Sequence, residues 1–229
     1  GATDMRRAIA VSSDVYFYEI GGGFGSQKGL GILNIKKYLQ KFGFGSKTEV
    51  EIGEEALGNI PDPDWKKKVF NEDWRLGNTY HTVIGQYGMT VSPIQVARAV
   101  SAIANNGTLV KPIFIKQATT TASTGEKIGG DPEHYKIVHE GMRLSTTGGT
   151  SKGLDVPYVE IAGKTGTAEL GVAKDRVNSW TIGFFPYDKP KYSYTIVMES
   201  GPVKNLTGAT SVMRQLTDWM NINAPEYFR

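Results

Sequence analysis

The chain has 229 residues, of which 39% are hydrophobic and 21% charged, and its formal net charge is +3 at pH 7. This length and composition suit one folded domain with a substantial core and argue against intrinsic disorder. The small net charge, with no basic run denser than the lysines at 66–68, gives nucleic-acid binding little support. The absence of cysteine excludes disulfides, thiolate nucleophiles and cysteine-ligated metals.

Metal binding and a membrane span also lack support. The histidines at 81, 134 and 139 do not share a helical face, so we expect no metal site, and nothing in the sequence calls for a cofactor. No stretch approaches the roughly 18 consecutive apolar residues of a membrane-spanning helix, and no signal-peptide pattern is present.

Helical patterns dominate the first part of the chain. Residues 1–2 are consistent with a cloning remnant, and apolar residues at helical spacing follow from Met5 onward. An apolar stripe at 32, 35, 39 and 42 predicts an amphipathic helix over residues 30–42, closed by glycines. Residues 43–91 contain prolines, glycines and several aromatic side chains, and we expect them to form a packed, functional loop region.

Two further helices are marked by their caps. Ser92-Pro93-Ile94-Gln95 combines capping-box spacing with proline at the first helical position, and predicts a helix that ends at residues 105–107. Residues 119–131 are rich in threonine, serine and glycine and predict an exposed turn or hairpin. Asp131-Pro132 then starts a helix that ends at Gly148-Gly149.

Three strands and a last helix complete the chain. β-rich runs over residues 158–168, 178–187 and 192–199 predict an antiparallel meander. An apolar stripe from Ala209 to Met220 predicts a C-terminal helix that covers one face of these strands. Because helices and strands occur in blocks, the class is α+β, with residues 3–155 mostly helical and residues 156–222 holding three strands plus the last helix.

The most informative stretch is residues 161–169, Ile-Ala-Gly-Lys-Thr-Gly-Thr-Ala-Glu. Its Gly-Lys-Thr is not the end of a phosphate loop, because that pattern needs glycine five residues before Gly163, where this chain has Tyr158. A Lys-Thr-Gly sequence in a β-branched run is instead one of the motifs of penicillin-recognising serine acyltransferases.

A strand is a suitable place for this motif to bind a carboxylate. The Lys164 ammonium and the hydroxyls of Thr165 and Thr167 can bind a substrate carboxylate, while Gly166 leaves the backbone open to close approach. Side chains alternate on a strand, so Lys164 and Gly166 should face one way, and Thr165 and Thr167 the other. The plain alternative is an exposed edge strand that uses its charges to prevent edge-to-edge pairing.

Other motifs accompany this one in a fixed order. They are Ser12-Ser13-Asp14, the loop at residues 75–86 and Ser92-Pro93-Ile94-Gln95, all upstream of Lys164-Thr165-Gly166. Their order and spacing resemble the transpeptidase domain of class B penicillin-binding proteins. Residues 60–67, Ile-Pro-Asp-Pro-Asp-Trp-Lys-Lys, resemble the elongation-type penicillin-binding protein 2 subgroup, and the whole resemblance covers residues 3 to about 221.

The resemblance implies a fold and an activity. The fold is the β-lactamase/transpeptidase-like α/β three-layer arrangement, with a five-stranded antiparallel sheet of which this chain would retain three strands. Residues 1–229 would then be a single partial transpeptidase domain. The implied enzyme is a peptidoglycan D,D-transpeptidase that cross-links stem peptides through a serine acyl-enzyme and is acylated by β-lactams. It would lie on the periplasmic face of the cytoplasmic membrane, held by an N-terminal anchor outside this sequence, and work with the elongation machinery and a glycosyltransferase.

The resemblance also assigns site residues. Ser12 would relay protons, Asp14 would stand where most relatives have asparagine, and Lys164 and Thr165 would bind the terminal carboxylate of the stem peptide or β-lactam. Gly166 would complete the motif, and the Thr167 backbone N–H would supply half of the oxyanion hole. Relatives usually have glycine at position 87, whereas this chain has tyrosine, and we expect that difference to be tolerated.

The family's nucleophile is a serine three residues before a lysine, and no lysine of this sequence has serine at that spacing. We therefore expect residues 1–229 alone to be inactive. Two alternatives stay open: a non-catalytic carboxylate-binding module, and a serine β-lactamase or penicillin-sensor domain. We also expect the strand at residues 192–199 to expose a sheet edge that favours self-association.

Overall fold

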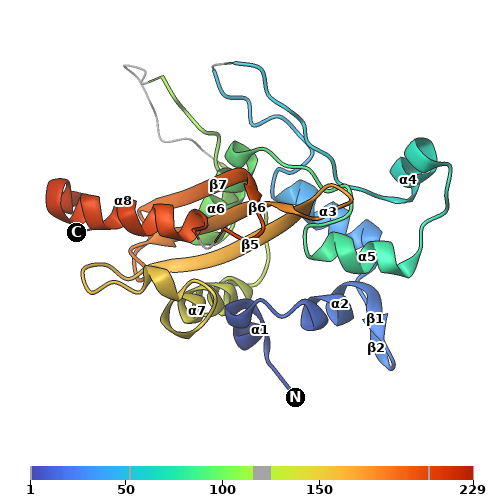
Figure 1. The fold of residues 1–229 in the computed structure, drawn as a ribbon, viewed down its shortest axis with the longest axis horizontal. Helices are drawn as coiled ribbons and strands as arrows, with labels where there is room; N and C mark the ends of the chain where they lie inside the picture. The colour runs from blue at the N-terminus through green and yellow to red at the C-terminus, as the bar shows by residue number, and fades with distance from the viewer. Residues whose placement is uncertain (1, 52, 116–124, 206, 229) are drawn as a thin grey trace. The chain divides into compact units, whose positions relative to one another are not determined.

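The computed structural model describes residues 2–51, 53–115, 125–205 and 207–228 (Figure 1). Its contacts divide the chain into two compact units. The first contains Gly1–Ser12, Val100–Gly107 and Gly129–Arg229, and the second contains Ser13–Ala99 and Thr108–Ile128. No helix in the described ranges is long and apolar enough to cross a membrane.

The first unit contains the three-stranded sheet and the helices that cover it. Its elements are α1 (Met5–Val11), the end of α6 (Pro93–Ala104), α7 (Pro132–Gly148), the 3₁₀ helix η1 (Lys152–Leu154), β5 (Ala162–Leu170), β6 (Arg176–Phe185), β7 (Tyr192–Pro202), α8 (Ala209–Asn223) and the 3₁₀ helix η2 (Pro225–Phe228).

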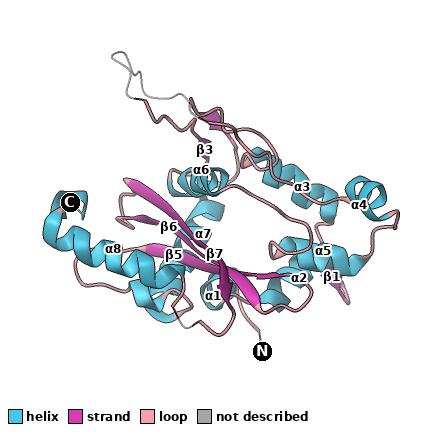
Figure 2. Ribbon diagram, turned by 45° about the horizontal axis from the view of Figure 1, so that its top comes forward, coloured by secondary structure: helices cyan, strands magenta, loops and turns pink. Residues whose placement is uncertain are grey.

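The sheet is the predicted antiparallel meander. Its strand order is β5-β6-β7, and these strands run side by side in Figure 2. In the register Lys164 lies opposite Ile182 and Thr165 opposite Thr181, and a bulge between Val177 and Ser179 interrupts the pairing of β6 with β7. The three-stranded antiparallel meander predicted from the sequence is therefore confirmed.

Helices pack on both faces of this sheet. Successive side chains of a strand point to opposite faces, and Phe184 and Phe185 show the two directions. The Phe184 ring lies 4.8 Å from the imidazole of His139 on α7, whereas Phe185 belongs to the apolar cluster that contains Met213 of α8. The sheet of the first unit is thus the middle of three layers.

The C-terminal stripe is only partly buried. Ala209 and Met213 of α8 are fully covered, but Val212, Leu216 and Trp219 are 39%, 44% and 57% exposed. A helix with apolar residues over a wide arc turns only part of that arc toward a sheet, so α8 covers the sheet as predicted with only part of its stripe buried.

The second unit is mostly helical. Its elements are α2 (Asp14–Gly22), β1 (Gly23–Phe24), β2 (Gln27–Lys28), α3 (Ile32–Lys41), α4 (Pro63–Phe70), α5 (Leu76–Val83), most of α6, β3 (Thr108–Leu109) and β4 (Glu126–Lys127). The helix predicted over residues 30–42 is confirmed as α3, whose Ile32 and Ile35 are buried.

Residues 43–91 are more regular than the sequence predicts, because α4 and α5 lie within them. Asp62 caps α4 by accepting a hydrogen bond of 2.7 Å from the Trp65 N–H, and Pro63 occupies the first turn. At the start of α5 the Arg75 N–H donates to Asn78 Oδ1 over 2.8 Å. These caps stabilise helices of eight residues each, which are too short for a clear apolar period.

The capping box of α6 is confirmed. The Ser92 N–H donates to Gln95 Oε1 at 3.0 Å, and the Gln95 N–H donates to Ser92 Oγ at 3.3 Å. Residues 119–124 of the turn predicted over residues 119–131 lie outside the described residues, and its described part includes β4, which pairs antiparallel with β3. The helix predicted from Asp131-Pro132 to Gly148-Gly149 is confirmed as α7.

Candidate active site

Ser12 ends α1 in an unusual backbone conformation. It is the C-cap of that helix with φ 55° and ψ 55°, and its N–H donates to the Ala8 and Ile9 carbonyls. Left-handed backbone at a helix C-terminus usually belongs to glycine, because a Cβ there costs about 1 kcal/mol. A serine held in this conformation by its surroundings is a feature that active sites often share.

Helix α1 is held against α7 by close backbone approach. Ala8 and Ala10 are completely buried, and the Thr150 N–H just beyond α7 donates to the Ala10 carbonyl at 3.0 Å. A Cβ added to Gly149 would lie 2.0 Å from that same carbonyl oxygen, and one added to Gly141 would lie 3.0 Å from the Ile9 side chain. Glycine at these positions therefore allows α1, and with it Ser12, to lie close to the backbone of α7.

Lys164 of β5 reaches the end of α1. Its Nζ donates to Ser12 Oγ at 2.8 Å and to the Thr165 carbonyl at 2.7 Å. The structure thus brings together two of the predicted site residues that are far apart in the sequence. An ammonium beside a hydroxyl stabilises developing negative charge on that oxygen, so the pair is suited to passing a proton between a substrate and the protein.

Thr165 points away from Lys164, as strand alternation predicts. Its Oγ1 donates to Thr150 Oγ1 over 2.8 Å, so the carboxylate-binding candidates Lys164 and Thr165 are held by different neighbours. Thr167 is exposed on the same strand. Since β6 pairs with only one edge of β5, the described structure leaves the other edge of the motif strand without a strand partner.

The glycines of the motif differ in crowding. A Cβ at Gly166 would make only ordinary contacts, 3.4 Å from the Cβ of Trp180. At Gly163 it would lie 3.0 Å from the Tyr194 hydroxyl, which packs under the strand. Burial raises the pKa of Tyr194, so its hydroxyl stays protonated. The sequence directs attention to Gly166, but Gly163 is the more crowded of the two glycines.

Asp14 occupies a different setting. It is exposed in the first turn of α2, in the second compact unit, where Ser13 caps the helix by accepting from the Tyr16 N–H at 3.4 Å. A carboxylate in the first turn of a helix interacts favourably with the helix dipole. The structure shows this local role for Asp14, and its part in chemistry stays a prediction.

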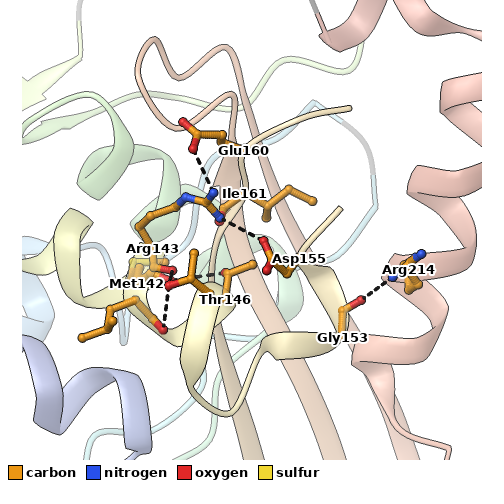
Figure 3. A network of polar contacts seen from close by, with 10 residues as sticks. Met142, Arg143, Thr146, Gly153, Asp155, Glu160, Ile161 and Arg214 are labelled. Carbon is orange, nitrogen blue, oxygen red and sulfur yellow. Dashed lines mark hydrogen bonds and ion pairs between the residues drawn. The ribbon is translucent and has the colours of Figure 1, made fainter. Parts of the chain in front are cut away.

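A polar network that sequence reasoning missed fixes the approach to β5 (Figure 3). The Arg143 guanidinium of α7 donates to Glu160 Oε1 at 2.9 Å and to the Ile161 carbonyl at 3.3 Å, and lies 3.8 Å from Asp155. Arg143 therefore holds the segment that leads into the Lys-Thr-Gly strand. A single arginine inside a helical period gives no sequence signal of such a role.

A second part of this network comes from α8. Arg214 donates to the Gly153 carbonyl at 3.2 Å and to both oxygens of Asp218. The Tyr158 hydroxyl also donates to Asp218, and hydrogen bonds from Tyr158 and Arg214 lower the pKa of that carboxyl group. Together Arg143 and Arg214 anchor the connection from α7 to β5 at two points.

Within the described ranges no group of three or more histidine, aspartate or glutamate side chains could hold a metal ion. The polar groups that the structure brings together around the motif strand are Ser12, Lys164 and the hydroxyls of Thr165 and Thr150.

Comparison with known proteins agrees with this geometry. Residues 1–218 match the family model of the penicillin binding protein transpeptidase domain. The peptidoglycan D,D-transpeptidase MrdA of Acinetobacter baumannii is 32% identical over 222 residues, which cover 88% of this chain and 32% of that protein. The MrdA protein of Haemophilus influenzae is 28% identical, over 99% of this chain and 38% of its own length.

Solved structures of penicillin-binding proteins are also similar to this chain. The penicillin-binding protein PBP2 of Helicobacter pylori, in a complex with MreC, matches with a TM-score of 0.82 and 30% identity, over 98% of this chain and 41% of that one. The β-lactamase/transpeptidase-like fold expected from the resemblance is thus confirmed. Because the family model matches residues 1–218 and the PBP2 structure of H. pylori is similar over nearly the whole chain, the chain belongs to the penicillin-binding protein transpeptidase family.

Proposed function

We propose that the protein is a peptidoglycan D,D-transpeptidase of the elongation-type PBP2 subgroup, which cross-links stem peptides and is acylated by β-lactams. The chain spans about a third of the length of the curated relatives that it matches. The observation that carries the proposal is the contact of Lys164 Nζ with Ser12 Oγ, because it joins two family motifs in one polar site.

In the proposed reaction, the serine of a Ser-x-x-Lys motif attacks the peptide carbonyl and forms an ester, and an amine of a second stem peptide then displaces that ester. Ser12 passes the proton toward the leaving amine, assisted by Lys164. Lys164 and Thr165 bind the terminal carboxylate, and the Thr167 N–H stabilises the oxyanion. An ionised Asp14 can take part only as a hydrogen-bond acceptor, where asparagine could also donate.

Residues 1–229 contain no Ser-x-x-Lys motif, so we propose that they form no acyl-enzyme by themselves. Intact-mass analysis after incubation with a penicillin tests this directly. The chain should keep its mass, while a form of the protein that includes a Ser-x-x-Lys motif should gain the mass of one penicillin. Slow loss of the adduct with release of hydrolysed penicillin would instead indicate a β-lactamase.

A second candidate rests on the same contact. A lysine amine 2.8 Å from a serine hydroxyl is also the arrangement of a Ser-Lys nucleophile and base. If Ser12 were the nucleophile, the chain itself would gain a penicillin adduct, and Ser12→Ala would abolish it while Ser13→Ala would not. That result would overturn the assignment of Ser12 as a proton relay.

Partners and location follow from the relatives. Because the H. pylori PBP2 structure is a complex with MreC, we propose a partner of the elongation machinery, together with a glycosyltransferase, outside the cytoplasmic membrane. The residues would form one partial transpeptidase domain attached to an N-terminal anchor. Co-purification of an MreC-type protein with the full-length protein supports this proposal, and its absence from cross-linked membranes contradicts it.

Self-association through β7 is a separate proposal. β7 forms an edge of the three-stranded sheet in the described structure, and an edge strand has unpaired N–H and C=O groups that can pair with another chain. Light scattering at increasing protein concentration should show a mass above that of one chain. A monomer mass at high concentration would rule the proposal out.

A further inference from the structure

We propose that Thr150 positions the Thr165 hydroxyl through a chain of four hydroxyls whose direction reverses when a carboxylate binds. The inference rests on the proposed function, because it takes the ligand of Thr165 to be the carboxylate of a stem peptide or β-lactam. It assigns to Thr150, Ser145 and Ser151 a role that none of the sequence motifs contains.

The four hydroxyls form a continuous path from β5 to the end of α7. Thr165 Oγ1 donates to Thr150 Oγ1 at 2.8 Å, Thr150 Oγ1 lies 3.4 Å from Ser145 Oγ, and Ser145 Oγ donates to Ser151 Oγ at 3.0 Å. The path runs from the half-buried Thr165 through the exposed Thr150 to two serines that are completely buried.

The backbone holds this path in place. The Thr150 N–H donates to the Ala10 carbonyl and the Ser151 N–H donates to the Ser145 carbonyl, both at 3.0 Å. These bonds do not involve the hydroxyls, so a hydroxyl can be removed without releasing the segment. Thr150 is therefore fixed relative to α1, which carries Ser12 at its end.

Counting protons shows what the path can do. Each hydroxyl has one proton and two acceptor sites. Ser145 gives its proton to Ser151, so the Thr150–Ser145 contact takes its proton from Thr150, and Thr165 in turn gives its own to Thr150. In this direction Thr165 has only acceptor sites left for a ligand, and an acceptor repels a carboxylate.

Reversal makes Thr165 a donor. When each of the four hydroxyls rotates, Ser151 donates to Ser145, Ser145 to Thr150 and Thr150 to Thr165, which frees the Thr165 proton for the carboxylate. No covalent bond breaks, and every hydroxyl keeps its own proton. Hydrogen bonds in such a chain polarise one another, so an accepted bond from Thr150 strengthens the bond that Thr165 donates to the anion.

The test compares acylation of the full-length protein by a penicillin and by the methyl ester of the same penicillin. The ratio of the two second-order acylation rate constants measures recognition of the carboxylate alone. Thr150→Val keeps the shape of the side chain and should lower the ratio by about five-fold, the worth of one neutral hydrogen bond. Thr150→Ser should restore it, and Ser145→Ala should lower it less, because its contact is longer.

Two control arms separate this inference from the proposed function. The unmodified protein should prefer the free carboxylate, and Thr165→Val should lower that preference at least as much as Thr150→Val. If it does not, carboxylate binding by Thr165 is wrong. If Thr165→Val lowers the ratio while Thr150→Val changes both rate constants equally or neither, the positioning role of Thr150 is wrong and the contact only ties β5 to α7.

Discussion

The contact between α1 and α7 and the segment that contains α4 and α5 are held together by opposite means. The first depends on very small residues, with Gly149 directly against the Ala10 carbonyl. The second depends on large rings: Trp65 and Trp74 each meet the Tyr87 ring edge-on, at 5.9 and 5.8 Å between centroids.

The second region also contains a buried charge. Lys66 is only 3% exposed, and its ammonium lies 3.0 Å from Asn78 Oδ1 and 3.2 Å from Glu72. A long side chain packed among rings can adjust its position, whereas two backbones in contact cannot. We therefore expect substitutions that add atoms to destabilise the α1–α7 contact. Substitutions that remove atoms should destabilise the α4–α5 segment.

Gly149→Ala should have the largest effect. Its Cβ would meet the Ala10 carbonyl at 2.0 Å, so α1 must move, and we expect a loss of about 3 kcal/mol in the free energy of unfolding. Urea unfolding followed by tryptophan fluorescence measures it. Gly148→Ala is the matched control, because a Cβ there meets nothing within 4 Å. Equal stability of the two variants would show that the close approach does not hold α1.

Asp62→Asn should cost about 2 kcal/mol at pH 7, the typical worth of hydrogen bonds to a charged group. Burial alone would raise the pKa of Asp62, but its bonds from Lys36 and the Trp65 N–H outweigh burial and lower it. Stability from a lowered carboxyl pKa is complete above the unfolded value of about 3.9 and is lost as pH falls through the folded value.

The difference in the free energy of unfolding between Asp62→Asn and the unmodified chain should therefore be constant from neutral pH down to about pH 5. It should shrink below about pH 4. Urea unfolding at a series of pH values measures it. Asp64→Asn, an exposed change in the same helical turn, should have little effect. A difference that grows as the pH falls would contradict the assigned ion pair with Lys36.

Tyr87→Gly should destabilise the second unit by about 1 kcal/mol, as the net of two opposing changes. Tyr87 has a φ of 54°, so glycine relieves backbone strain, but the ring contacts with Trp65 and Trp74 are lost. Tyr87→Asn, which also tolerates this φ, serves as the comparison in thermal unfolding. Increased stability of Tyr87→Gly would mean that strain outweighs the aromatic contacts.

Gly77→Ala should have the smallest effect, and of opposite sign. A Cβ at this position in α5 meets nothing within 4 Å, and alanine favours helix over glycine by about 0.5–1 kcal/mol. A small rise in the thermal unfolding temperature is the expected result. A fall would show that the second region is as closely packed as the α1–α7 contact.

Local chemistry made much of the fold predictable. The capping box at Ser92 and Gln95, the helix start at Asp131-Pro132 and the three β-rich runs each gave a correct element, because the signal lies within a few residues. Helices α4 and α5 were missed because their stability comes from caps and from the burial of Lys66, not from a long apolar period.

The site was predictable only in part. The Lys-Thr-Gly motif identified Lys164 and Thr165, and the resemblance supplied Ser12, but no pattern indicated Thr150, Arg143 or the crowding at Gly163. Their roles arise from contacts between elements distant in the sequence. Such contacts depend on tertiary packing, which a single sequence does not display.

The left-handed conformation of Ser12 sets stability against the proposed proton relay at one position. Glycine would end α1 more favourably, so selection for thermal stability alone should enrich Ser12→Gly, and with it lose the hydroxyl that accepts from Lys164. Directed evolution of a more stable protein would have to keep Ser12 unchanged and find stabilising substitutions at other positions.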